Sequence, residues 1–280
     1  MAEGFPFLLA QIATAFLGAV VGSFLNVVVY RLPRGLSIVR PRSFCPACQR
    51  PIPWFRNVPL LSFLLQRGRA ACCGAAISWR YPLIEAATAA LFLACLRRVA
   101  AHAIVPIGLG GYAAAGLLCL LVALLVAITF IDAEHFLIPD VLSLPAIPIG
   151  IATAYFFGPA LGVSVRGSLV GFVAGAGTLL VVLQVYAMVT GRAGLGGGDY
   201  KLMGLIGAWL GAASLPFTLL AASVQGLLWA VAAKGLKLFP EGGSFRHAAV
   251  PFGPFLALAA VEWLLFQDQL RPLVLPYDLA

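Results

Sequence analysis

Two aspartates in apolar surroundings are the residues of this sequence best suited to chemistry. Asp132 directly follows an apolar run, and Asp199 directly follows three consecutive glycines. Ionisable side chains at membrane depth are costly and are usually functional. When two carboxyl groups share one site, one pKa rises and the other stays low, so one group can accept a proton while the other donates. The pair therefore predicts acid–base hydrolysis of the aspartic-protease kind.

The same region has a simpler explanation, in which the carboxylates are solvated loop groups beside membrane ends. Asp140 follows a proline and precedes an apolar run, so we predict that it caps that helix. Glu134 and His135 are predicted to be interfacial loop residues. In the second acidic motif, Gly196 and Gly198 lack side chains and would let a substrate backbone approach closely.

The composition places these acids in a membrane protein. Of 280 residues, 62% are hydrophobic and only 10% are charged, whereas a soluble domain carries about 25% charged residues. A spanning helix needs about 20 apolar residues, and the first apolar run is too long for a signal peptide. We predict an all-α integral membrane protein with about eight transmembrane helices, at 7–30, 82–99, 107–131, 139–157, 164–190, 200–212, 214–236 and 250–267.

The segment 31–80 differs from the rest of the chain. It holds nine arginines, no acidic residue and four of the six cysteines. Basic residues gather in cytoplasmic loops. If 31–80 is cytoplasmic, eight spans also place 190–201 and 234–249 there, with fourteen of the 18 basic residues. Both chain ends then lie outside, and both acidic motifs lie at the cytoplasmic edge.

We therefore divide the chain into three parts. Residues 1–30 are the first transmembrane span, 31–80 form a cytoplasmic, basic, cysteine-containing domain, and 81–280 form the membrane domain with the aspartate pair. No internal repeat is visible by eye.

Five motifs, in order along nearly the whole chain, resemble the type IV prepilin leader peptidases, which are membrane aspartic proteases with a Gly-x-Gly-Asp motif. Each motif alone is weak, but five in the same order are specific. They are Gly18-x3-Gly22-Ser23-Phe24-Leu25-Asn26-Val27-Val28-x-x-Arg31-Leu32-Pro33, Cys45-Pro46-x-Cys48, Ile77-Ser78-x-Arg80-Tyr81-Pro82-Leu83-x-Glu85, Asp132 followed by Ile138-Pro139-Asp140, and Gly196-x-Gly198-Asp199-x-Lys201-Leu202.

The resemblance implies an activity and a location. Asp132 and Asp199, not Asp140, would cleave the short basic leader from type IV prepilins or pseudopilins at the cytoplasmic face of the bacterial inner membrane. Many family members also methylate the new N-terminus with S-adenosylmethionine. Membrane lipids are the expected contacts of the arginines, and no nucleic acid is expected. Substrate or cofactor contacts are predicted at Glu85, Gly196, Gly198, Lys201 and Asn26.

Residues of the first two spans have alternative roles. Glu85 could bind the substrate's new amine or the methyl donor, or pair with Arg80. Asn26 could hydrogen-bond across helices or orient the cytoplasmic domain. Gly18 and Gly22 are predicted to form a helix-packing face. Two further cysteines lie in predicted spans and are expected to pack there: Cys95 and Cys119.

The cysteine segment departs from the family pattern at Ala70, where a cysteine is expected, and Cys72 is additional. Cytoplasmic thiols stay reduced, and structural Zn²⁺ favours four thiolates. Neighbouring cysteines are awkward ligands for one ion because their side chains diverge, so a zinc site and a metal-free loop domain both remain open. The zinc ligands would be Cys45, Cys48, Cys72 and Cys73. The same segment, with its arginines, Trp54 and Phe55, is the expected location of part of the methyl-donor pocket.

Two other classes of function compete with the protease. A transporter could use the aspartate pair as a proton or cation relay, but it is expected to place acids near mid-span and to contain repeats. A non-catalytic scaffold could bind a partner through the cysteine segment. Conversion of a prepilin by the purified protein separates the enzyme from both.

Overall fold

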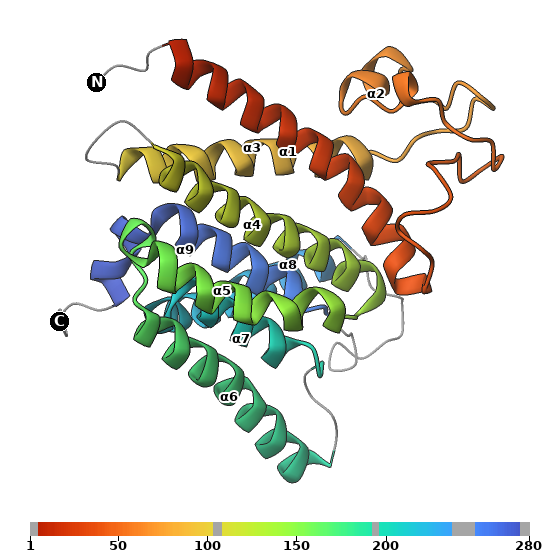
Figure 1. Cartoon of the computed structure of the whole chain (residues 1–280). Coiled ribbons are helices and arrows are strands. Elements are labelled where there is room, and N and C mark those ends of the chain that lie inside the picture. The colour runs from red at the N-terminus through yellow and green to blue at the C-terminus, as the bar shows by residue number, and fades with distance from the viewer. Residues whose placement is uncertain (1–4, 103–107, 192–195, 237–249, 275–280) are drawn as a thin grey trace. The chain divides into compact units, whose positions relative to one another are not determined.

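The computed structural model describes residues 5–102, 108–191, 196–236 and 250–274 (Figure 1). Within these ranges the regular elements are helices, and no strand is present. Each of the eight predicted spans corresponds to one helix, so the all-α prediction is confirmed. The eight helices are α1 (Phe5–Arg31), α3 (Arg80–Ala101), α4 (Leu109–His135), α5 (Asp140–Leu161), α6 (Val165–Thr190), α7 (Asp199–Leu210), α8 (Leu215–Gly235) and α9 (Gly253–Val274).

Judged by length and composition, five of the described helices can cross a membrane: α1, α4, α5, α6 and α8. For α1 the apolar segment extends to Arg34, and for α8 it begins at Ala212. The chain is therefore a multi-pass membrane protein. The helix α7 has only 12 residues, and the count of eight crossings stays a prediction. Several basic residues that entered the predicted topology lie outside the described residues: Arg192, Lys237 and Arg246.

The chain divides into two compact units, residues 1–127 and 128–280, with the boundary inside α4. We did not predict this boundary, and the expected divisions after residues 30 and 80 stay predictions. Each unit is described by itself below.

In the first unit, α1 packs closely on α3 through two glycines (Figure 1). A Cβ atom on Gly18 would lie 2.7 Å from the Cα of Ala89, and one on Gly22 would lie 2.7 Å from the Cα of Glu85. Only residues without a side chain let the two backbones approach so closely. The predicted helix-packing face is thus confirmed.

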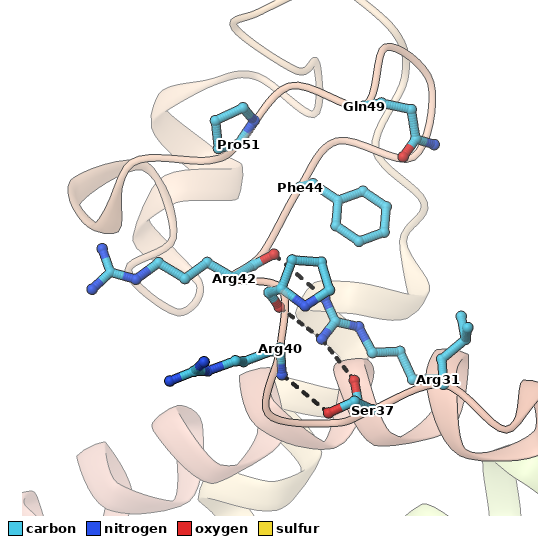
Figure 2. Close-up of a pocket in the computed structure, with 9 residues that line it drawn as sticks. Arg31, Ser37, Arg40, Arg42, Phe44, Gln49 and Pro51 are labelled. Atoms are coloured by element: carbon cyan, nitrogen blue, oxygen red, sulfur yellow. Dashed lines mark hydrogen bonds between the residues drawn. The ribbon is translucent and has the colours of Figure 1, made fainter.

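The segment between α1 and α3 consists mostly of loops, with the short helices η1 (Leu32–Arg34), η2 (Trp54–Arg56) and α2 (Leu61–Leu65). Its first loop is tied to the end of α1 by Arg31, which is 4% exposed. Figure 2 shows hydrogen bonds from the Arg31 guanidinium to this loop, where Nη1 donates to the carbonyl oxygens of Ser37 (3.0 Å) and Pro41 (2.8 Å).

In the second unit, α7 is short but almost wholly buried, and it packs against α5 and α6. Every residue from Leu202 to Leu210 is buried. At its C-terminal end, Trp209 Nε1 donates to the carbonyl oxygen of Ala146 in α5 at 2.8 Å. These contacts fix the helix that begins at Asp199.

The end of α4 differs from the prediction. The third span was expected to end at residue 131, but α4 continues to His135, and Glu134 and His135 are helical rather than loop residues. The helix ends where Phe136 adopts a φ of 52°. Asp132 therefore lies in the last turn of a helix, where its side chain has a defined direction.

Candidate active site

Asp132 is held by a backbone donor from the far end of the sequence. Its side chain is buried, with 5% exposed, and its Oδ2 accepts a hydrogen bond from the Gly253 N–H at 3.0 Å. Gly253 is the first residue of α9, and the first N–H groups of a helix have no partner inside it. A Cβ atom on Gly253 would lie 2.6 Å from Asp132 Oδ2, so the contact requires glycine.

Asp199 is the first residue of α7 and is 6% exposed. The Gly196 N–H hydrogen-bonds its carboxyl group. Burial, followed by the negative charge of Asp132, raises the pKa of Asp199 to about 7. The structure thus brings together the two aspartates that the sequence singled out, and they interact electrostatically.

One apolar side chain packs against both glycines beside this pair. Ile138 is 5% exposed. A Cβ atom on Gly198 would lie 2.7 Å from the Ile138 Cβ, and one on Gly253 would lie 3.2 Å from its Cδ1. Gly198 therefore has a packing reason to be glycine, and a substrate contact at Gly196 or Gly198 stays a prediction.

Asp140 is not a helix cap, so that prediction is wrong. Pro139 occupies the cap position of α5, and no side chain caps this helix end. Asp140 is the first helical residue and instead accepts a hydrogen bond from Lys201 Nζ at 2.6 Å. This pair is open to solvent, with side-chain exposures of 56% for Asp140 and 22% for Lys201.

The sequence reasoning missed Gly253 and the packing role of Ile138. Gly253 lies between Pro251 and Pro254 at the start of an apolar run, and this Pro-x-Gly-Pro motif was the sequence signal for it.

A buried carboxyl pair with backbone donors can divide acid and base roles, because the two groups differ in their surroundings. The arrangement is suited to activating a water molecule.

Two predicted contact residues lie in the first unit. Asn26 Nδ2 donates to the carbonyl oxygens of Gly22 (3.2 Å) and of Tyr81 in α3 (3.3 Å), which confirms the hydrogen bond across helices. Glu85 Oε2 accepts the Leu60 N–H at 2.7 Å. This bond ties α3 to the loop segment. A role of either residue in binding substrate or cofactor stays a prediction.

The four cysteines of the loop segment form a single cluster. Their Sγ atoms all lie within 4.8 Å of one another, with 3.4 Å between Cys48 and Cys72 and 3.7 Å between Cys45 and Cys73. Four sulfurs about 2.3 Å from one zinc ion lie about 3.8 Å apart in a tetrahedron. The Sγ atoms of Cys72 and Cys73 are 3.9 Å apart, so our expectation that neighbouring side chains diverge is wrong.

The two other cysteines are buried, as predicted. Cys95 and Cys119 are 0% and 7% exposed. The Cys119 Sγ lies 3.8 Å from the carbonyl oxygen of Phe92. They pack inside the first unit.

Comparisons with known proteins cover most of the chain. A family model described as "Bacterial Peptidase A24 N-terminal domain" matches residues 16–99, and one described as "Type IV leader peptidase family" matches residues 119–231. Among solved structures, none matches.

Three relatives are each named prepilin leader peptidase/N-methyltransferase. The relative from Pseudomonas aeruginosa is 38% identical over 92% of this chain and 91% of its own length. The relative from Klebsiella pneumoniae is 43% identical over 74% of this chain and 87% of its own length. The relative from Neisseria gonorrhoeae is 36% identical over 90% of this chain and 88% of its own length.

Proposed function

Because this chain belongs to the type IV leader peptidase family, we propose that it is a membrane aspartic endopeptidase that removes the basic leader of type IV prepilins or pseudopilins. The observation that carries the proposal is the buried pair Asp132 and Asp199, which interact at the ends of two helices. The names of the relatives, which cover nearly the whole chain, support the same reaction.

The surroundings of the two carboxyl groups suggest their roles. Both accept a backbone N–H, so that bond alone does not distinguish them. Because burial and the charge of Asp132 raise the pKa of Asp199, Asp132 is assigned as the base that takes a proton from water. Asp199, with its pKa near 7, keeps its proton and hydrogen-bonds the scissile carbonyl oxygen. Water attacks the carbonyl carbon, and the tetrahedral intermediate collapses as Asp132 passes a proton to the leaving amine.

The topology that suits this reaction is the predicted one. The chain would lie in the bacterial inner membrane with eight crossings, residues 31–80 and the aspartate pair on the cytoplasmic face, and both ends outside. With these eight crossings, fourteen of the 18 basic residues lie on the cytoplasmic side, as expected for an inner-membrane protein. A prepilin leader is basic and stays in the cytoplasm, so the scissile bond would meet the pair at that face.

The second activity would be transfer of a methyl group from S-adenosylmethionine to the new N-terminus. The names of the relatives support it. The sulfonium and amino groups make this donor cationic overall, and the segment 31–80 has no acidic residue to face it. Glu85, whose Oε2 accepts the Leu60 N–H of that segment, would be a carboxylate that meets the donor or the new amine.

A zinc ion would stabilise the loop segment. Three sulfur–sulfur distances of the cluster, 3.4, 3.7 and 3.9 Å, are close to the spacing of a tetrahedral site. A segment with so little regular structure gains much of its folding energy from a metal. Replacing Cys45 and Cys48 by serine should lower bound zinc and reduce methylation more than cleavage. Equal loss of both activities would instead mean that the segment supports the whole fold.

Anionic lipid headgroups would bind the arginines beside the membrane end of α1. A cavity of about 470 Å³ there is lined by Arg31, Arg40 and Arg42 together with apolar residues such as Leu36 and Phe44 (Figure 2). Within the described part of the chain, the buried Arg31 guanidinium contacts carbonyl oxygens and the Phe44 ring rather than a carboxylate. None of these contacts neutralises the positive charge of the guanidinium, so an anionic headgroup would do so.

The lipid proposal is tested by retention of phosphatidylglycerol against phosphatidylcholine on the detergent-purified protein. Each arginine near a membrane surface is worth about 1 kcal/mol, so Arg40→Gln with Arg42→Gln should weaken retention about thirty-fold. The matched control is Arg67→Gln with Arg69→Gln, which removes the same charge from exposed positions of the same segment. Equal losses in the two pairs would indicate diffuse attraction and no site.

The main proposal is tested by incubating the purified protein with a prepilin and measuring the intact mass of the product. Leader removal supports the peptidase, and a further gain of one methyl group supports the transferase. The transporter and scaffold alternatives predict an unchanged prepilin. The comparisons give the transporter no support, since the named relatives are peptidases.

A further inference from the structure

The first cysteine-bearing turn, residues 44–51, has a characteristic set of backbone contacts. The Cys45 N–H donates to the Arg50 carbonyl oxygen at 2.9 Å, and the Gln49 N–H donates to the Cys45 carbonyl oxygen at 2.8 Å. An isolated antiparallel bridge joins Phe44 and Pro51. The turn reverses at Gln49, which has a φ of 59°.

The second turn, residues 69–76, repeats each of these contacts. The Ala70 N–H donates to the Ala75 carbonyl oxygen at 2.7 Å, and the Gly74 N–H donates to the Ala70 carbonyl oxygen at 2.7 Å. An antiparallel bridge joins Arg69 and Ala76, and the reversal occurs at Gly74, with a φ of 73°. The two turns are therefore an internal repeat, which is not visible in the sequence.

The repeat aligns the two turns residue by residue. Cys73 takes the place of Cys48, but Ala70 takes the place of Cys45. The second turn has its other thiol at Cys72, where the first turn has an alanine. The second turn thus lacks a thiol where the backbone of the first presents one, and it has a thiol where the first has none.

The displaced thiol still reaches the cluster. The Cys72 Sγ lies 3.4 Å from the Cys48 Sγ, and the Cys73 Sγ lies 3.7 Å from the Cys45 Sγ. Each thiol of the second turn therefore lies beside one from the first. Zn²⁺ has no geometric preference from its d electrons, so it tolerates ligands from two turns with unequal spacing.

We propose that Cys72 serves as the fourth zinc ligand in place of the thiol that the second turn lacks at position 70. One ligand of the second turn lies two residues further along the chain than its counterpart in the first turn. The site still has four thiolate ligands. This proposal rests on the zinc site proposed above, and it makes a stronger claim: a cysteine restored at position 70 makes Cys72 dispensable.

The test uses three forms of the full-length purified protein: unmutated, Cys72→Ala, and Ala70→Cys combined with Cys72→Ala. Zinc content, competition with a chelator and the thiolate-to-metal absorption of the cobalt-substituted protein are measured for each. The unmutated chain should bind one zinc ion with four thiolates. Cys72→Ala should bind at least about a hundred-fold more weakly, because even an outer-shell partner of a metal is worth 10–100-fold.

The combined variant should recover affinity to within about ten-fold of the unmutated protein and regain the absorption of four thiolates. Cys95→Ala is the matched control, because it removes a buried thiol outside the cluster, and it should change neither measurement. Recovery in the combined variant also excludes misfolding as the cause of loss in Cys72→Ala.

The remaining outcomes separate the two proposals. If the unmutated protein contains no zinc, the proposed zinc site is wrong. Full affinity in Cys72→Ala means that Cys72 is not a ligand, although the site stands. Weak binding in both variants means that position 70 cannot present a ligand, and this overturns the proposal that a cysteine there can replace Cys72.

Discussion

Among single residues, the two buried aspartates each accept a backbone N–H, from different elements. Asp132 accepts the N–H of the first residue of α9, and Asp199, the first residue of α7, accepts the N–H of Gly196. Burial and the charge of Asp132 raise the pKa of Asp199. Unequal surroundings of this kind let one carboxyl act as base while the other stays protonated.

Gly253→Ala should reduce cleavage strongly without unfolding the protein. The added Cβ would lie 2.6 Å from Asp132 Oδ2, so the carboxylate must move, and a displacement of about 1 Å can cost about a hundred-fold in rate. The loss should appear in kcat rather than in KM, measured with a purified prepilin. Gly177→Ala is the control, because a Cβ there meets nothing within 4 Å; similar losses in both would refute the positioning role.

Cleavage should fall as the pH rises through about 7. Above that value Asp199 loses the proton with which it hydrogen-bonds the carbonyl oxygen, since its pKa is about 7. The measurement is kcat/KM against pH, with about a ten-fold decline per pH unit on the alkaline side. A profile that stays flat up to about pH 9 would contradict this assignment.

The same raised pKa has a consequence for stability. An unfolded aspartate has a pKa of about 3.9, so between about pH 4 and about pH 7 the native state binds more protons than the unfolded state. Stability from this group is present below that window and is lost as the pH rises through it. Asp199→Asn should remove this part of the pH dependence of the thermal midpoint.

The aspartate pair could be predicted because the acids stand out against apolar runs and form a Gly-x-Gly-Asp motif. Gly253 could not, because its contribution is a backbone N–H, and the sequence does not reveal where a backbone donor points. The cap prediction for Asp140 failed for a related reason. Its position after Pro139 suits a cap, but Lys201 of α7 binds its carboxylate, and that partner is far away in the sequence.

At the scale of elements, long apolar runs predicted all eight helices, because a membrane helix needs only a continuous apolar stretch. The boundaries of α4 were harder, since Asp132 and Glu134 are polar yet helical. The repeat of two turns was not visible because it consists of backbone hydrogen bonds. Its equivalent positions carry different residues, such as Gln49 and Gly74, and only the fold aligns them.

The contact between α1 and α3 should be sensitive to a single methyl group. Gly22→Ala places a Cβ 2.7 Å from the Glu85 Cα, and relieving such a clash costs about 1–3 kcal/mol. The thermal midpoint of the detergent-purified protein should fall. Gly116→Ala should leave it unchanged or raise it, because a Cβ there meets nothing within 4 Å and alanine favours a helix.

At the scale of the whole molecule, the number of crossings determines on which side each loop lies. Eight crossings follow if α3, α7 and α9 span the membrane together with the five helices that meet the length and composition criteria. The chain end would then be outside. A reporter that works only outside the cytoplasm, fused to the C-terminus, should be active; activity of a cytoplasm-only reporter at that position would contradict the eight-crossing topology with both ends outside.

Cleavage of the prepilin leader should require both Asp132 and Asp199, and this is tested by the intact mass of a prepilin treated with three purified variants. Asp132→Asn and Asp199→Asn should each leave the full-length prepilin, because an amide can neither take the proton from water nor supply one. Asp140→Asn should still remove the leader, because its carboxylate is solvent-exposed and paired with Lys201. Leader removal by a folded Asp132→Asn or Asp199→Asn protein, or its loss only in Asp140→Asn, would rule out this aspartate pair as the catalytic pair.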